Sequence, residues 1–100
     1  MFMPLVAALL VQGSLVDIMA ADASLENCIK LATDDALLKD VQPTAFPSHL
    51  TKICGPTRDK WMKARDAADG ENADPEDTFY KAKARFDSAA AAYSKRYSSR

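Results

Sequence analysis

The chain has 100 residues, of which 48% are hydrophobic and 27% charged, and its formal net charge is −1. This length allows a single domain, and this composition excludes a chain that is disordered throughout. Only three glycines stand among many alanines, which favours helix over sheet. We therefore expect an all-α fold, a small bundle of three to four helices.

The charge is unevenly distributed along the chain. Residues 1–56 carry three Lys or Arg against six Asp or Glu, whereas residues 78–100 carry six against one. A basic terminal helix can face an acidic protein, an anionic lipid or a nucleic acid. We favour a solvated face whose cations suit a helix C-terminus, and we expect no nucleic-acid partner because the whole chain has no basic excess.

The first 13 residues form an apolar segment without a charged side chain. Gly13 is a plausible interruption, and the following Ser-Leu-Val-Asp has the form of a capping box, so we expect a helix to start at Ser14. The chain then divides into an apolar lead segment, residues 1–13, and a single helical domain, residues 14–100. The residues expected to contact a partner protein or lipid are Phe2, Leu5, Leu9 and Leu10.

The same segment fits two other roles. As a secretory signal it has an apolar centre and an A-x-A cleavage pattern at Ala21–Ala23, but no positive residue precedes the centre. As a membrane span from Phe2 to Ala21 it would contain several polar residues, Asp17 among them. We favour a retained segment that is buried against something outside this chain.

Apolar residues next recur at three- and four-residue spacing as far as Ala36. This spacing predicts an amphipathic helix that ends near Lys39. A second helix start is possible at Ser24, so one long helix and a broken one are both open.

Residues 41–57 are expected to form a proline-rich connector, because three X-Pro pairs oppose regular helix. One short turn can begin at Pro47, with Leu50 and Ile53 facing inward. A helix then starts at residue 56 or 57 and stops at Gly70. Its inner side is marked by Trp61, Arg65 and Ala68.

The clearest helix start in the chain is the sequence DPED at residues 74–77. Asp74 is the expected N-cap, Pro75 takes the first helical position, and two acidic residues follow. Aromatic and small residues then recur at heptad-like spacing from Phe79 to Tyr97, which predicts a packing stripe. The predicted core of the bundle consists of Leu25, Trp61, Phe79, Phe86 and Tyr93.

Cys28 and Cys54 are the only cysteines, so a disulfide within the chain has one possible connectivity. It would close a loop of about 27 residues and stabilise the fold by roughly 3 to 4 kcal/mol. Two free thiols are the alternative. We favour the disulfide, and with it a non-cytosolic oxidising compartment: an organelle lumen, an intermembrane space or the cell exterior.

No catalytic or cofactor signature is present. His49 is the only histidine and has no recognisable catalytic partner, and two cysteines with one histidine lack zinc-ligand spacing. Placing Gly70 at the glycine of a calcium loop puts Arg65 and Ala67 where acidic ligands belong. We predict no cofactor and no enzymatic activity. In a pigment complex His49, Gln12 or Asn27 could ligate magnesium, without specific support from the sequence.

Two classes of function follow. The first is a small helical accessory subunit that docks on a larger, membrane-associated complex and stabilises its assembly, for example at the lumenal or intermembrane face of an energy-transducing complex. The second is an exported, disulfide-stapled helical ligand or effector from which residues 1–23 are cleaved.

Overall fold

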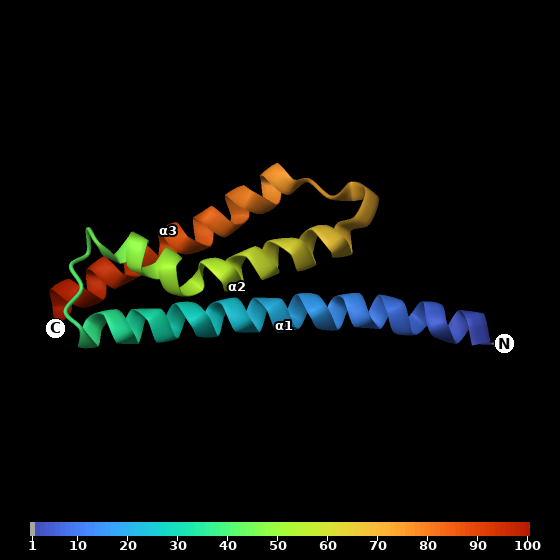
Figure 1. Ribbon diagram of the computed structural model, residues 1–100, viewed down its shortest axis with the longest axis horizontal. Helices are drawn as coiled ribbons and strands as arrows, with labels where there is room; N and C mark the ends of the chain where they lie inside the picture. Colours follow the sequence, from blue (N-terminus) through green and yellow to red (C-terminus); the bar gives the residue numbers. More distant parts are fainter. Residues whose placement is uncertain (1) are drawn as a thin grey trace.

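The computed structural model describes the backbone of residues 2–100 and the side chains of residues 15–100. Three helices make up this part of the chain: α1 (Phe2–Leu38), α2 (Phe46–Asp69) and α3 (Pro75–Ser99). A short 3-10 turn, η1 (Gly70–Asn72), connects α2 to α3, and residues 2–100 contain no strand (Figure 1). The prediction of a small all-α bundle of three to four helices is therefore confirmed.

The molecule is elongated, with principal extents of 60 × 24 × 19 Å. Its radius of gyration is 16.8 Å, whereas a compact domain of this length has about 13 Å. The long dimension comes from α1, since its 37 residues span about 55 Å at 1.5 Å per residue. The N-terminal end of α1 projects beyond the end of α2, and the C-terminus lies at the opposite end of the molecule (Figure 1).

α1 is continuous across both of the expected starts, Ser14 and Ser24. The predicted break at Gly13 is wrong, because α1 is continuous through it and a glycine inside a helix costs only about 1 kcal/mol relative to alanine. Continuing the backbone hydrogen bonds outweighs the local caps that the two serines offer. The role of residues 1–13 as a separate docking segment stays a prediction.

α1 ends in a Schellman motif, close to the expected residue 39. Asp40 takes the left-handed conformation with φ 56°. The Val41 N–H donates to the Ala36 carbonyl at 2.9 Å, and the Asp40 N–H donates to the Leu37 carbonyl at 3.3 Å. Val41 also packs against the cluster that contains Ala36, the apolar contact that accompanies this motif. The turn therefore satisfies carbonyls that the helix end would leave without donors.

The predicted connector over residues 41–57 is wrong in extent, because only residues 39–45 separate α1 from α2. α2 begins at Phe46, and Pro47 lies in its first turn, where a proline lacks an N–H that the helix does not use. The helix then passes through Pro56 without ending. Of the three prolines that predict a loop, Pro43 lies in the connector, Pro47 lies in the first turn of α2, and Pro56 lies inside α2.

Gly55 eases the passage through Pro56. A proline ring clashes with the Cβ of the preceding residue in helical conformation, and glycine has no Cβ. Pro56 still leaves the Lys52 carbonyl without its usual N–H donor. Leu50 is fully buried as predicted, whereas Ile53 is 39% exposed and does not face inward. Because α2 starts at Phe46, its helical phase decides which of its side chains face the core. The prediction of a short turn at Pro47 did not include this phase.

The turn between α2 and α3 follows its local sequence signals. Gly70 ends α2 with φ 56°, and its N–H donates to the Asp66 carbonyl. The Asp74 side chain caps α3 by accepting a hydrogen bond from the Asp77 N–H at 3.3 Å, and Pro75 is the first residue of the helix. The predicted boundaries at Gly70 and Asp74 are confirmed.

The core consists of two clusters. The first contains six buried residues from all three helices: Ala32, Ala36, Phe46, Leu50, Cys54 and Tyr93. The second contains Leu25, Trp61 and Ala82. Phe86 is half-buried and packs against both clusters.

Leu25, Trp61 and Tyr93 are buried, as predicted, but besides Ile53 two further predictions of inward residues are wrong. Phe79 is 54% exposed, and the buried residue at that turn is Thr78. The Thr78 hydroxyl donates to Asp66 Oδ1 at 2.7 Å, so this turn of α3 presents a polar side chain to α2. Ala68 near the end of α2 is also exposed.

Candidate functional site

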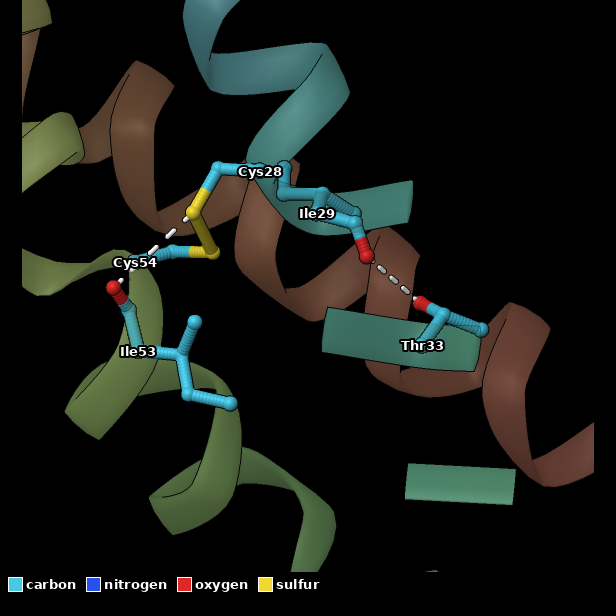
Figure 2. Close-up of a disulfide and its surroundings, with 5 residues drawn as sticks. All are labelled: Cys28, Ile29, Thr33, Ile53 and Cys54. Carbon is cyan, nitrogen blue, oxygen red and sulfur yellow. Dashed lines mark hydrogen bonds between the residues drawn. A yellow bond between two sulfur atoms is a disulfide. The ribbon is translucent and has the colours of Figure 1, made fainter. Parts of the chain in front are cut away.

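A disulfide joins the C-terminal third of α1 to the N-terminal half of α2. Cys28 and Cys54 are bonded, and their Cα atoms are 5.9 Å apart, an ordinary separation for such a bridge. Cys54 is fully buried, and the Cys28 sulfur lies 3.8 Å from the Ile53 carbonyl oxygen (Figure 2). Such a bridge fits an oxidising compartment.

An apolar surface lies on the outer side of α1. Leu15, Val16 and Met19 are 57%, 61% and 69% exposed. They lie on one face of the helix, roughly opposite Ala21 and Leu25, which pack toward α2. We call Leu15, Val16 and Met19 the outer apolar face of α1. The predicted contact residues in the preceding segment, which are Phe2, Leu5, Leu9 and Leu10, have side chains outside the described residues.

A polar cluster around Trp61 connects all three helices. The Trp61 indole N–H donates to Asp22 of α1, and the Arg85 guanidinium of α3 donates to the same carboxylate oxygen at 3.0 Å. The guanidinium carbons of Arg65 and Arg85 lie 5.6 and 5.7 Å from the centre of the indole ring. We call these four residues the tryptophan cluster.

The tryptophan cluster stabilises the ionised form of Asp22. The indole hydrogen bond is the largest influence and lowers the pKa of Asp22 below its ordinary value, with Arg85 acting in the same direction. Burial opposes this shift. The Asp22 side chain remains 43% exposed, so the cluster ties the helices together at the surface without enclosing a reaction site.

The C-terminal half of α3 packs on the turn that follows α1. Tyr93 stacks on Phe46 with ring centres 4.0 Å apart and planes 8° apart. Its hydroxyl donates to the Val41 carbonyl, and burial raises the pKa of that hydroxyl. The Tyr93 ring is thus fixed at both its face and its polar end.

The Asp40 carboxylate accepts hydrogen bonds from the end of α3. It accepts a hydrogen bond from the Tyr97 hydroxyl at 2.9 Å and another from Arg100. Gln42 donates to the same Tyr97 hydroxyl at 2.9 Å. Tyr93, Tyr97 and Arg100 of the terminal helix therefore have partners within the chain, as the predicted packing stripe requires. The absence of a nucleic-acid partner stays a prediction.

The residues considered for metal or pigment binding are not brought together. His49 Nε2 lies 3.2 Å from Asp35 Oδ2, whereas Asn27 is exposed on α1. Gln12 lies outside the described side chains. Among the described residues no group of three or more His, Cys, Asp or Glu could hold a metal ion. The predictions of no cofactor and no enzymatic activity stay predictions.

Sequence reasoning missed Asp22, Arg85 and Phe46 as organising residues. Asp22 was considered only as part of a cleavage pattern, and no sequence signal pairs it with Trp61, which is 39 positions away. Phe46 precedes a proline and was therefore placed in a loop. An X-Pro pair also fits the first turn of a helix, and that signal was available.

The fold and the cysteine pair define a small, disulfide-bonded all-α protein. No protein-family model, no curated protein and no solved structure matches this chain. Within the part of the chain that the structure describes, no helix is both long and apolar enough to cross a membrane.

Proposed function

We propose that this protein is a non-enzymatic accessory subunit that docks through α1 on a larger, membrane-associated protein complex and stabilises its assembly. The observation that carries the proposal is the outer apolar face of α1. Three neighbouring aliphatic or thioether side chains there are each more than half exposed. Burying such a face against a partner is favourable by about 25 cal/mol for each Å² of apolar surface.

The tryptophan cluster supports retention of the N-terminal segment. Cleavage after Ala23 would remove Asp22 and with it the acceptor for both Trp61 and Arg85. Removing one partner of such a hydrogen bond leaves the other group without compensation. A chain evolved for cleavage at this site would not need this acceptor, so the bonds favour a subunit that keeps α1 whole.

Co-purification tests the docking proposal. The double variant Val16→Lys, Met19→Lys places two charges on the outer apolar face without opposing the helix. We expect the tagged full-length chain to co-purify with a membrane complex in mild detergent, and the double variant to lose most of that complex. The matched control is Leu31→Lys, Leu38→Lys, because both of these residues are also exposed on α1.

The docking proposal requires that the variant of the outer apolar face loses the complex and that the control variant keeps it. If both lose the complex, the effect comes from added charge and not from the outer apolar face. If the unaltered chain purifies alone from the detergent extract, with Met1 present by intact mass, the docking proposal is wrong.

A specific observation also favours the second function, an exported disulfide-stapled ligand or effector. Every buried side chain among residues 15–100 lies at Leu25 or later, and so do both cysteines. A chain that begins at residue 24 would keep this core. Intact mass of the protein from its source separates the two functions, because only the exported ligand lacks residues 1–23.

A further inference from the structure

α2 and α3 line a partly open apolar cavity that none of the contacts above uses. Its volume is about 240 Å³, which is larger than the 150 Å³ apolar cavity that binds benzene in another protein. Leu50 and Ala82, both fully buried, line its floor. Phe79, Phe86, Pro47 and Ala90 complete its apolar lining.

The cavity lies where the two core clusters meet. Leu50 belongs to the first cluster and Ala82 to the second. The facing residues are small, since Ala82 and Ala90 stand where larger side chains would fill the space.

One cation at the rim remains available to a ligand. Lys83 and Asp87 both line the cavity and neutralise each other in an ion pair of 2.8 Å. Arg58 lies with its guanidinium carbon 5.2 Å from the centre of the Phe86 ring, and only its Nε donates to Asp59, at 3.4 Å. Its two Nη groups therefore remain as a planar pair of donors among the described residues.

The position of Arg58 favours a carboxylate. A guanidinium binds a carboxylate through two parallel hydrogen bonds. The Arg58 side chain is only 29% exposed, so its charge acts in surroundings less polar than bulk water. Phe79, whose ring is more than half exposed, would be covered by an apolar chain that enters beside it.

We propose that this cavity binds a monomeric medium-chain alkyl carboxylate, with the chain between Phe79 and Phe86 and the carboxylate on Arg58. The apolar lining fits the alkyl chain, and the two Nη groups of Arg58, which the ion pair with Asp59 leaves free at the rim, complement the head group. This binding site does not depend on docking through α1, since the cavity is formed by α2 and α3 alone.

Titration with octanoate and with 1-octanol tests the proposal on the oxidised full-length protein. Calorimetry is expected to show one saturable site for octanoate and weaker binding of 1-octanol. Arg58→Gln is expected to weaken octanoate binding about fivefold or more and to leave 1-octanol binding within twofold. Arg58→Lys, which keeps the charge, and the exposed control Lys60→Gln are expected to bind octanoate within about threefold of the unaltered protein.

A second measurement needs no variant. Isotope-filtered NMR on the unaltered protein is expected to show contacts between the octanoate chain and ring protons of Phe79 and Phe86. Ala90→Leu, which fills the cavity, is expected to remove binding of both ligands while its circular dichroism remains helical. The proposal is overturned if octanoate does not bind, if its ring contacts lie elsewhere, if 1-octanol and octanoate respond alike to Arg58→Gln, or if only vesicles of anionic lipid bind.

Discussion

At the residue scale, Asp22 joins the three helices near Trp61, because it accepts side-chain hydrogen bonds from two other helices. It links α1 to Trp61 of α2 and to Arg85 of α3 through one carboxylate oxygen. A hydrogen bond to a charged group contributes more than one between neutral groups. The stability of the bundle should therefore depend on the ionisation of this residue.

Replacing Asp22 by Asn should lower the stability at pH 7 by about 1 kcal/mol, because a neutral amide is a weaker acceptor for the indole and the guanidinium. The pKa of Asp22 is lowered from the ordinary 3.8 in the folded protein. Its contribution is therefore present above pH 3.8 and is lost as the pH falls through the lower, folded value. Thermal unfolding between pH 2 and 7 should show a difference that shrinks toward pH 2.

The control for this change is Asp17→Asn, an exposed position on the same helix. It alters the formal charge equally and should change the melting temperature little at any pH in that range. A constant difference between Asp22→Asn and the unaltered protein from pH 2 to 7 would contradict the assigned role of the carboxylate.

The sequence predicted correctly that several large apolar or aromatic side chains are buried. It predicted poorly the positions that depend on a polar partner from another helix. Leu25, Trp61 and Tyr93 are large apolar or aromatic side chains on helical stripes, and they are buried. Phe79 fits the same stripe but is exposed. The Thr78 hydroxyl instead faces α2 and donates to Asp66, a contact that periodicity does not reveal. Periodicity fixes a helix face only to within about one residue.

At the scale of the elements, local signals predicted α3 and tertiary packing determined α2. Asp74 and Pro75 mark a start that depends only on neighbouring residues. The start of α2 depends on the burial of Phe46 and Leu50 against α1 and α3, which the sequence around Pro47 does not show. Long-range packing therefore overrode the local preference for a loop.

The interior proline of α2 gives a prediction at this scale. Pro56→Ala restores an N–H donor for the Lys52 carbonyl and removes the ring clash, which together cost a helix about 3 kcal/mol. The greater freedom of the unfolded chain offsets up to about 1 kcal/mol. The variant should therefore be more stable by about 2 to 3 kcal/mol in chemical denaturation.

Pro75→Ala is the matched control, since Pro75 is the first residue of α3 and displaces no helical hydrogen bond. It should leave the stability unchanged or slightly lower. A Pro56→Ala variant that is less stable than the unaltered protein would mean that the core requires the shape which Pro56 gives to α2.

At the scale of the whole molecule, the disulfide compensates for a small core. Its reduction should lower the free energy of unfolding by about 3 to 4 kcal/mol. For a chain of this size that corresponds to a fall in melting temperature of roughly 12 to 32 °C. Calorimetry with and without reductant measures the difference, and intact mass shows whether two hydrogen atoms are missing.

The double variant Cys28→Ser, Cys54→Ser is the control for this measurement. It should melt near the temperature of the reduced protein and should not respond to reductant. A large response of this variant to reductant would show that the effect has another origin.

Truncation tests how much of the molecule the fold requires. A chain of residues 24–100 keeps every buried residue described above but loses Asp22. We expect it to remain helical and to melt below the full chain by at least as much as Asp22→Asn does, because it keeps no acceptor for Trp61 and Arg85. A chain of residues 15–100, which keeps Asp22, should melt close to the full chain, as circular dichroism can show.

The bridge between α1 and α2 also sets how the molecule carries a mechanical load. A force applied between the two termini passes along α1 to Cys28, crosses the sulfur atoms and continues from Cys54 to α3. The 26 intervening steps of the chain bear no tension, and their extension of about 90 Å is never released. Most residues of the first core cluster lie within this unloaded loop, whereas the tryptophan cluster lies on the loaded path. A subunit pulled between a partner at α1 and another at its C-terminus would thus load the tryptophan cluster and the contacts of α3, while the disulfide keeps residues 28–54 from extending.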